Sequence, residues 1–412
     1  MTRAMLEGIL MGVASLVSVP IVIFFLECVA ALWPRRMPAG QATPATEKPL
    51  AVLIPAHNEE AGIAETVRGI RAQAKPGDRV LVVADNCSDA TAEKARAEGA
   101  EVLERRDPER RGKGYALSFG LKHLGAAPPD VVVFVDADTR VEPGSLDALR
   151  RSASSERRPV QAVNLLDPPP GARGTQYVSA FAFLTKNKVR PTGLSRLGIP
   201  CHLLGTGMAI PWELIDVDRL ATGNIVEDMQ MGIDLSIAGT PPRFCFDATV
   251  KGSFPDAAKA ALVQRTRWEH GHLFTILTQC PRLAWQALRR GRPWLLGMAL
   301  DLAVPPLALL CLLWILVAGG AAFVALRIGH PQTAFISAGS GGLLFLAVFL
   351  AWVRHGRRHV PGHVLLFAPV YVLWKIPVYA GFLFRRQKEW VRTERKDESG
   401  VLKKPTPPTG TV

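Results

Sequence analysis

The sequence is poor in cysteine and lacks the common phosphate-binding and dinucleotide-binding motifs. Six cysteines are scattered over 412 residues without a CxxC pair, which argues against a zinc site or a disulfide framework and fits a reducing compartment. Arg111-Gly-Lys-Gly114 falls short of a P-loop, and no GxGxxG follows the first predicted strand. These absences count against zinc proteins, P-loop nucleotidases and dinucleotide oxidoreductases. The histidines that we considered as metal ligands have no suitable spacing: His57, His202, His270 and His272.

Acidic residues are in the minority, because 36 Asp and Glu stand against 49 Lys and Arg, a formal net charge of +13. A basic balance suits nucleic acid, an anionic membrane surface or an anionic substrate. Hydrophobic residues make up 48 % of the chain, and they concentrate near the N-terminus and in the last third, where much of the positive charge also lies. The pattern favours a membrane as the partner, and we do not expect nucleic acid.

Residues 1–36 are predicted to form an N-terminal transmembrane anchor. Ile9 to Trp33 is long enough to cross a bilayer and carries a single charge, Glu27. The run does not end in a small-residue cleavage site, so we expect an uncleaved anchor. Arg35 and Arg36 follow it, and the positive-inside rule then places the next part of the chain in the cytoplasm and the protein in the inner (plasma) membrane.

Two more spans are expected, one within Leu295–Leu326 and one within Thr333–Val353. Basic clusters precede the first and follow the second, and two crossings keep both clusters in the cytoplasm. His363–Phe384 is also apolar, but Lys375 at its centre and two prolines favour an interfacial helix over another crossing. Residues 286–384 are therefore predicted to form transmembrane and interfacial helices.

Between a linker at residues 37–48 and these helices, residues 49–285 alternate between short apolar runs and helix-like segments. This alternation predicts an α/β fold with a mostly parallel sheet, helices on both faces, and ligands bound beyond the carboxyl ends of the strands. The predicted strands are Leu50–Pro55, Val80–Ala84, Val131–Val135 and Val160–Leu165, and the predicted helices are Gly62–Gln73, Ala90–Glu98 and Gly114–Leu124.

Polar side chains follow three of these strands directly, at His57–Glu59, Asp85–Asn86 and Asp136-Ala-Asp138. Alternation points Asp136 and Asp138 to the same side of an extended chain. Hard cations bind through one or two carboxylates plus substrate phosphates, so this pair predicts a site for Mg²⁺ or Mn²⁺. The plain alternative is that loops are polar in every protein, so that polar residues end most strands.

Two later segments also carry groups suited to chemistry. Glu227-Asp228 directly precedes the helical pattern Met229–Ala238. The pair supplies either a carboxylate base for catalysis or an acidic first turn that complements the helix dipole. Gln264, Arg267 and Trp268 share one helix face, and a guanidinium suits phosphate charge while an indole suits stacking on a sugar. An amphipathic helix lying on the membrane is the alternative for this segment, and the two readings are compatible.

In their order along the chain, these motifs resemble the family 2 glycosyltransferases with a GT-A fold, particularly the membrane-bound bacterial branch that contains polysaccharide synthases. The resemblance runs from about residue 50 to residue 268 and implies a cytoplasmic catalytic domain that uses a metal-bound nucleotide-sugar. In that family the carboxylate that matches Asp85 contacts the nucleotide base, and the DxD that matches Asp136 and Asp138 holds the metal. The resemblance assigns nucleotide-sugar binding to Pro55, Glu59, Asp85, Lys113, Asp136, Gln264, Arg267 and Trp268.

The resemblance also assigns the catalytic groups and a lid. Glu227-Asp228 matches the ED motif, whose aspartate is the general base of an inverting displacement, so the base is Asp228. Residues 385–412 are a basic tail, and Trp390–Arg395 within it resembles the segment that gates the nucleotide pocket in related synthases. This match makes Trp390, Thr393 and Arg395 candidates for a lid, provided that the tail lies in the cytoplasm.

The chain departs from the family pattern in three places. Ala84 replaces the first acid of the usual DDxS pair, which loosens the inference about the nucleotide. Gly205-Thr-Gly-Met208 occupies the position of the acceptor-side loop and has no role that the sequence alone supplies. The predicted spans are also fewer than in polymer-extruding synthases.

The leading hypothesis is transfer of a sugar from a nucleotide-sugar to a saccharide or lipid-linked acceptor in exopolysaccharide or cell-envelope glycan synthesis. The expected donor is a UDP-sugar. Partner proteins of a glycan assembly system are then expected. Single transfer to a polyprenyl phosphate is an alternative within the same class. An inactive membrane scaffold of an envelope assembly complex is an alternative from another class, and loss of the DxD or of Asp228 would favour it; neither is lost.

Overall fold

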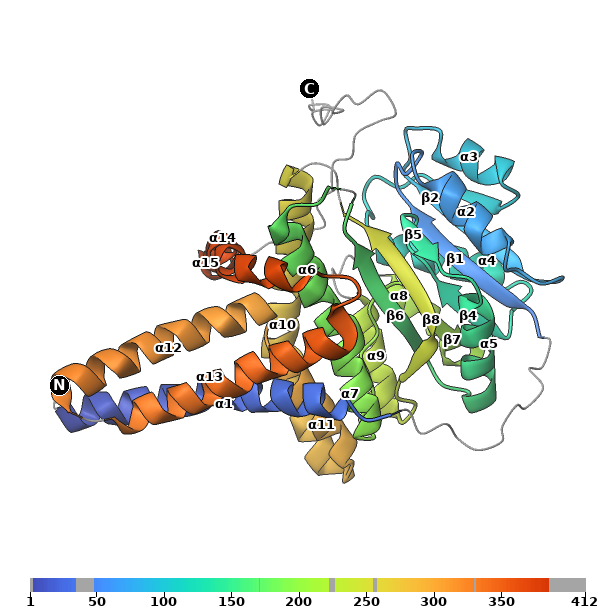
Figure 1. Ribbon diagram of the computed structural model, residues 1–412. Helices are drawn as coiled ribbons and strands as arrows, with labels where there is room; N and C mark the ends of the chain where they lie inside the picture. Colours follow the sequence, from blue (N-terminus) through green and yellow to red (C-terminus); the bar gives the residue numbers. More distant parts are fainter. Residues whose placement is uncertain are drawn as a thin grey trace, which may run out of the picture.

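The structure is a computed structural model that describes residues 3–34, 48–169, 171–221, 227–254, 258–329 and 331–384. It has two parts, an α/β domain and a helical part that projects from it (Figure 1). The predicted tail, including Trp390, Thr393 and Arg395, lies outside the described residues, as does most of the predicted linker.

An eight-stranded mixed sheet forms the centre of the α/β domain. In spatial order it consists of β3 (Glu101–Arg105), β2 (Arg79–Asp85), β1 (Leu50–Ala56), β4 (Val131–Phe134), β7 (Met208–Pro211), β6 (Val160–Asp167), β8 (Arg243–Ser253) and β5 (Thr139–Val141). The first four strands are parallel, β7 is antiparallel to both of its neighbours, β6 and β8 are parallel, and β5 is antiparallel to β8. The four strands predicted from apolar runs are all present; β3, β5, β7 and β8 are additional.

Helices cover both faces of the sheet, as the alternating pattern predicts. Leu50, Val52 and Ile54 of β1 face one core with α2 (Ile63–Arg71) and α5 (Ser145–Glu156). Ala51 and Leu53 face the other core with α4 (Lys113–Leu124) and α8 (Val217–Leu220). Burial on both faces explains why β1 reads as a continuous apolar run rather than an alternating one. The remaining helices of the domain are α3 (Thr91–Ala97), η2 (Trp212–Leu214) and α9 (Glu227–Ala238).

Long helices connect the sheet to the projecting part. One continuous helical segment comprises α6 (Gly174–Leu184), a π-helical turn η1 (Thr185–Val189) and α7 (Arg190–Arg196). Two further helices, α10 (Ala258–Arg290) and α11 (Pro293–Ala303), are separated by a break at Gly291 and Arg292. Pro293 starts α11 at a position where a missing amide hydrogen is harmless.

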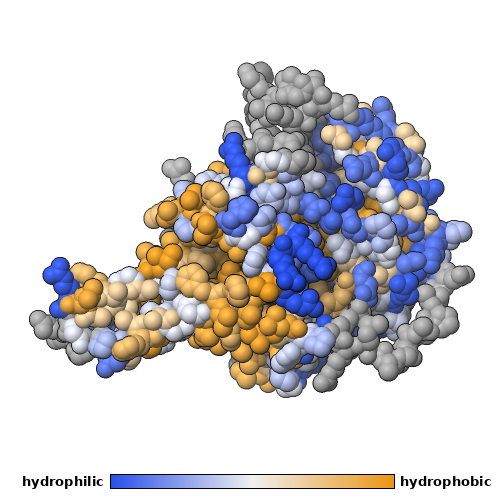
Figure 2. Space-filling model, viewed as in Figure 1, coloured by the Kyte–Doolittle hydropathy of each residue, from blue (hydrophilic) through white to orange (hydrophobic). Residues whose placement is uncertain are grey.

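The projecting part is a bundle of α1 (Arg3–Ala30), α12 (Leu307–Ile328) and α13 (Gln332–Ala351), followed by η3 (Trp352–Gly356). The N-terminus and the α12–α13 connection lie at its far end, away from the sheet (Figure 1). Apolar residues dominate the surface of the bundle base (Figure 2). Four stretches are long and apolar enough to cross a membrane: Glu7–Ala30, Leu307–Arg327, Gln332–Gly356 and Gly362–Phe382. The apolar stretch predicted within Leu295–Leu326 is divided near Pro305 into α11 and α12, so the span is α12.

The last described stretch is broken into η4 (Gly362–Phe367), α14 (Ala368–Trp374) and α15 (Ile376–Phe384). The break falls at Lys375, whose side chain is buried, pairs with Glu269 of α10 and lies over the Tyr371 and Trp374 rings. Figure 1 shows α15 end-on and α12 from the side, so α15 runs across the bundle rather than along it. Its length also permits a crossing, and the interfacial placement stays a prediction.

Candidate functional site

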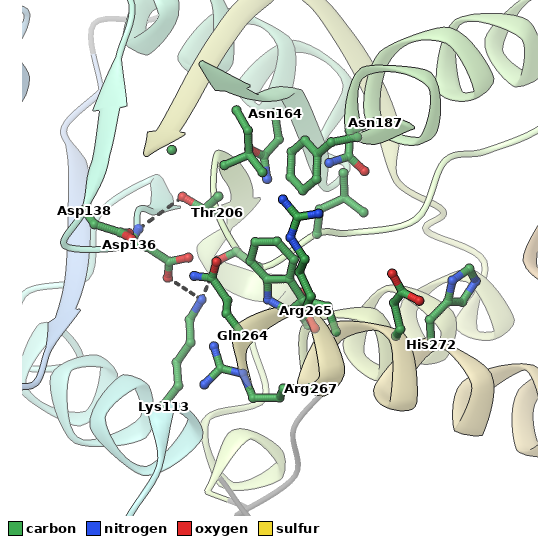
Figure 3. A pocket seen from close by; sticks show the side chains of 18 of the residues that line it. Lys113, Asp136, Asp138, Asn164, Asn187, Thr206, Gln264, Arg265, Arg267 and His272 are labelled. Atoms are coloured by element: carbon green, nitrogen blue, oxygen red, sulfur yellow. Dashed lines mark hydrogen bonds and ion pairs between the residues drawn. The ribbon is translucent and has the colours of Figure 1, made fainter. Parts of the chain in front are cut away.

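A cavity of about 1280 Å³ lies between the carboxyl ends of the strands and helices α6, α9 and α10 (Figure 3). It gathers side chains from Phe24 to Lys375, which are 351 positions apart in the sequence. All the predicted site residues within the described part of the chain line it: Pro55, Glu59, Asp85, Lys113, Asp136, Asp138, Glu227, Asp228, Gln264, Arg267 and Trp268. The roles assigned to these residues individually stay predictions, but their assembly around one space is what the sequence hypothesis requires.

The loops after β1 and β2 are held together by short polar contacts. Asn58 and Asn86 both adopt the left-handed conformation, with φ of 54° and 51°, which asparagine tolerates better than most residues. Asn58 Oδ1 accepts a hydrogen bond from the backbone amide of Ser88 at 2.7 Å. His57 Nδ1 lies 2.6 Å from the carbonyl oxygen of Asp85. His57 is therefore a structural bridge between the two loops, in agreement with the absence of metal-ligand spacing.

Asp85 is buried in the cavity wall beside an arginine that sequence reasoning missed. Its Oδ1 accepts hydrogen bonds from Arg105 Nη1 at 2.6 Å and from Asn86 Nδ2 at 3.0 Å. The Arg105 guanidinium also lies 5.7 Å from the ring centre of Tyr115, another cavity residue. Arg105 ends β3, a strand that the apolar pattern did not reveal, so nothing in the sequence paired it with Asp85.

Lys113 lies at the centre of the site, where α4 begins. Its Nζ donates to Asp136 Oδ1 at 2.5 Å and to the carbonyl oxygen of Gly205 at 2.8 Å (Figure 3). Burial lowers the pKa of Lys113, but the carboxylates of Asp136, Glu227 and Asp228 outweigh this effect and raise it. The ammonium is therefore charged at neutral pH and links the DxD to the start of α9.

The Gly205–Met208 loop, which the sequence left without a role, lies against this lysine. Gly205 has a φ of +83°, and a Cβ atom there would lie 2.6 Å from Asp228 Oδ2 and 3.3 Å from Lys113 Nζ. A side chain at position 205 would therefore displace Asp228. Thr206 Oγ1 accepts a hydrogen bond from the backbone amide of Asp136 at 3.1 Å, which fixes the DxD against the same loop.

Asp136 and Asp138 leave the end of β4 and both line the cavity. Among the described residues, no group of three or more His, Cys, Asp and Glu side chains is arranged to hold a metal ion. Two carboxylates without further protein ligands match the way Mg²⁺ is usually bound, with substrate phosphates and water completing the shell. The residues present therefore fit a divalent ion that arrives with a diphosphate.

Glu227 and Asp228 form the first turn of α9, and they are oriented into the cavity. Burial and the adjacent charge of Asp228 raise the pKa of Glu227 to about 7. Burial also raises the pKa of Asp228, although the Lys113 ammonium opposes the shift. Carboxyl groups with pKa values moved toward neutrality are suited to accept a proton during catalysis.

Helix α10 supplies the opposite wall with Gln264, Arg267 and Trp268. Burial lowers the pKa of Arg267, and the charges of Asp136, Glu227 and Asp138 counter this effect, as expected for a guanidinium that faces the carboxylates. The Trp268 ring lies 5.7 Å from the ring of Phe183 on α6. The shared face predicted from the spacing is thus present.

Comparisons with known proteins give the following similarities. A family model described as "Glycosyltransferase like family 2" matches residues 47–271. A probable glucomannan 4-beta-mannosyltransferase of Arabidopsis thaliana is 26 % identical over 53 % of this chain and 42 % of its own length. A 4,4'-diaponeurosporenoate glycosyltransferase of Staphylococcus aureus is 35 % identical over 29 % of this chain and 32 % of its own. The chain thus spans less than half the length of these curated relatives.

Among solved structures, a mannosyltransferase from Pyrobaculum calidifontis in complex with GDP-Man and Mn²⁺ has a similar fold. It superposes with a TM-score of 0.56 at 18 % identity, covering 92 % of this chain and 100 % of that chain. The shared coverage includes the projecting helices as well as the sheet, so the likeness in fold extends beyond the α/β domain.

Proposed function

Since the chain belongs to glycosyltransferase family 2 and is a glycosyltransferase, we propose that it moves a sugar from a nucleotide-sugar to a saccharide or lipid-linked acceptor at a membrane. The observation that carries this proposal is the cavity where the strand-end loops, the DxD, the first turn of α9 and one face of α10 meet. An inactive scaffold has no need of this assembly, so we set that alternative aside.

The donor binds against the loops after β1, β2 and β4 in this proposal. Asp85, held by Arg105, contacts the base, and Lys113 and Arg267 lie near the diphosphate. Asp136 and Asp138 hold Mg²⁺ or Mn²⁺, which when bound neutralises charge on the leaving diphosphate. The Pyrobaculum relative was solved with Mn²⁺, which supports the use of a divalent ion.

Asp228 is the general base in this proposal. The acceptor oxygen attacks the anomeric carbon on the side opposite the diphosphate, and its proton passes to the Asp228 carboxylate. Asp228 lies against Gly205 and near the Lys113 ammonium, and burial keeps its pKa above the usual range of an aspartate. The configuration at the anomeric carbon is therefore inverted.

The donor nucleotide and the acceptor are the open parts of the proposal. A UDP-sugar is our first candidate, and a GDP-sugar is the second because the Pyrobaculum structure holds GDP-Man. By their names, the curated relatives act on glucomannan in one case and on 4,4'-diaponeurosporenoate in the other, which supports both saccharide and lipid acceptors. Synthesis of exopolysaccharide or cell-envelope glycan, in the inner membrane and with a cytoplasmic site, fits the charge pattern around the four apolar stretches.

Product analysis tests the proposal directly. Membranes containing the protein are incubated with radiolabelled UDP- and GDP-sugars, and the organic-soluble and polymeric products are separated. We expect label to enter one product class from one donor, with inverted configuration; a ladder indicates polymer building and a single adduct indicates one transfer, including transfer to a polyprenyl phosphate. Retained configuration, or no transfer from any donor, would contradict the proposal.

A further inference from the structure

The cavity has an inner end that the donor does not need. Beyond Trp268 its wall continues with Phe24 of α1 and with the α11–α12 turn, including Pro306, Leu307 and Leu310. Phe24, Leu307 and Leu310 belong to two of the stretches that are long and apolar enough to cross a membrane. The inner end is therefore lined by aliphatic and aromatic side chains of the membrane helices, whereas the outer end is lined by carboxylates and amides.

One cation in this inner end has no directly bonded partner in the described part of the chain. Lys186, in the π-helical turn η1, lines the cavity and makes no hydrogen bond or ion pair with any described residue. Its neighbour Arg190 is fully engaged, because it donates to Glu27 Oε2 at 2.8 Å and to Asp301 Oδ1 at 2.7 Å. Burial, followed by the charge of Arg190, lowers the pKa of Lys186, and the carboxylates of Glu269, Asp228 and Asp301 do not offset this effect, so an anion directly beside it would be favourable.

A second polar group in the same turn is also unsatisfied. The Asn187 side chain is 3 % exposed, lines the cavity, and its Oδ1 has no hydrogen-bond partner among the described residues. Figure 3 shows it on the side of the cavity away from Asp136 and Asp138. A buried amide oxygen without a partner is costly unless a ligand donates to it. π-helical turns occur frequently at functional sites, and this one presents Lys186 and Asn187 together.

We propose that the inner end binds the acceptor, and that the acceptor is a membrane lipid whose head group carries a phosphate and a hydroxyl. Lys186 pairs with the phosphate, Asn187 Oδ1 accepts a hydrogen bond from the head group, and the chain of the lipid lies against Phe24 and Leu310. A neutral saccharide would supply no counter-charge for Lys186 and would gain little from the aliphatic wall. The inference rests on the proposed function and deepens it by naming the class of acceptor.

The transfer step is balanced with this acceptor. The head-group hydroxyl oxygen forms a bond to the anomeric carbon of the donor sugar. The bond from that carbon to the diphosphate oxygen breaks, and its electron pair leaves with the nucleoside diphosphate. The hydroxyl proton passes to the carboxylate of Asp228, which lies in the same cavity as Lys186.

Binding of three matched probes to the full chain in detergent tests the proposal. Dioctanoyl phosphatidylglycerol has the phosphate, the hydroxyls and the chains; dioctanoylglycerol lacks the phosphate; glycerol 1-phosphate lacks the chains. We expect the first to bind at least about 10-fold more tightly than either of the others, because it alone offers both a phosphate for Lys186 and chains for the apolar wall. If glycerol 1-phosphate binds as tightly as the phospholipid, the site recognises only an anion. If dioctanoylglycerol binds as tightly, the site recognises only apolar chains. Either result overturns the proposal.

Variants assign the binding to the inner end. Lys186→Met should weaken binding of the phospholipid about 10-fold or more, and Lys186→Arg should retain it. Lys188→Met is the matched control, because Lys188 belongs to the same turn but does not line the cavity. This variant should bind the phospholipid as tightly as the unmodified protein does. Ala308→Trp should block the chain and leave binding of glycerol 1-phosphate unchanged. Unchanged affinity in Lys186→Met would overturn the assignment.

Donor hydrolysis by water separates this proposal from the proposed function. In Lys186→Met, nucleotide-sugar binding and slow release of nucleoside diphosphate should persist while lipid binding is lost. If the unmodified protein binds the phospholipid but neither binds nor hydrolyses any nucleotide-sugar, the proposed function fails and the lipid site stands. If it hydrolyses donor but fails to distinguish the three probes, the lipid acceptor fails and the sugar transfer stands.

Discussion

The two walls of the cavity are built by different means. The sheet wall carries the DxD and the base-side loops at the ends of parallel strands, where backbone ladders fix the positions of the side chains. The helical wall, formed mainly by α6, α9 and α10, rests on α1, α7 and α11, whose mutual positions depend on side chains. Arg190 of α7 joins Glu27 of α1 to Asp301 of α11, and all three side chains are buried.

Close packing adds to this ion network. A Cβ atom on Gly193 of α7 would lie 2.1 Å from the carbonyl oxygen of Glu27, so the backbones of α7 and α1 approach as closely as glycine allows. The difference teaches that the sheet wall can be altered at single site residues without disturbing the fold, whereas the helical wall is sensitive to the loss of one buried charge. Substitutions in the sheet wall should therefore lower activity without lowering stability, whereas substitutions in the buried ion network should lower stability.

The largest effect is expected at the DxD. Asp136→Asn or Asp138→Asn should lower turnover by more than about 10³-fold, because a bound cation contributes several kcal/mol to transition-state stabilisation. Removal of divalent ions with a chelator should do the same. Asp167→Asn is the control, since this carboxylate ends β6 outside the cavity and pairs with Lys251 at 3.4 Å. Turnover that survives chelation would rule out the metal role. The unfolding temperature of both Asp→Asn variants should equal that of the unmodified protein, because the sheet wall tolerates the change.

Asp228→Asn should lower kcat about 10²- to 10⁴-fold while nucleotide-sugar affinity is retained, as expected for loss of a general base. Asp234→Asn on the same helix is the control, because Asp234 lies outside the cavity and pairs with Arg282 at 2.8 Å. Steady-state rates and donor binding by isothermal titration measure the two quantities. A loss of affinity without a loss of kcat would make Asp228 a structural residue.

Arg190→Met should break the helical wall rather than the chemistry. It leaves Glu27 buried without its cation and Asp301 with His202 alone, and removal of one member of a buried ion pair typically costs about 3–5 kcal/mol. Thermal unfolding in detergent should therefore shift to lower temperature. Arg289→Met, at an exposed position near the end of α10, should leave it nearly unchanged. Equal unfolding temperatures for the two variants would show that the network does not hold α1, α7 and α11 together.

The pH profile of kcat should report the carboxyl pair of α9. Asp228 accepts a proton only when ionised, so kcat falls as the pH falls through its pKa. Burial raises that pKa, which places the acid limb above the pH expected for an exposed aspartate. The Lys113 ammonium opposes this rise, so Lys113→Met should raise the pKa of Asp228 further and move the acid limb to higher pH. A limb that stays in place would mean that another group controls it.

The smallest effect is expected in the tail, which neither wall includes. If Trp390 closes over bound donor, Trp390→Ala should lower turnover about 2- to 10-fold, the range of a single aromatic contact. The placement of the tail is tested first by labelling an introduced cysteine in intact cells with an impermeant reagent. Ready labelling would put the tail outside and end the lid hypothesis; a wild-type rate for Trp390→Ala with the tail inside would leave it as a membrane-binding strip.

Much of the sheet wall could be predicted from the sequence because its signals are local. Val131–Phe134 reads as a buried strand, and Asp136 and Asp138 follow it within the same short segment. The spacing of Gln264, Arg267 and Trp268 likewise fixes a helix face without reference to the rest of the chain. The Asp85–Arg105 pair could not be predicted, because Arg105 ends a partly exposed strand that lacks an apolar pattern.

The sequence by itself determined the α/β class, the apolar helices, the motifs and the family. The α/β class and the apolar helices follow from periodicity and composition within short stretches of chain, and the family follows from the resemblance that the motifs carry. Only the tertiary structure decided that Lys113 bridges Asp136 and Gly205, that Gly205 must be a glycine to make room for Asp228, and that Lys186 and Asn187 face the cavity unsatisfied. These contacts join segments tens of residues apart, and their energies depend on burial and distance, which come into being only when the sheet and the membrane helices pack together.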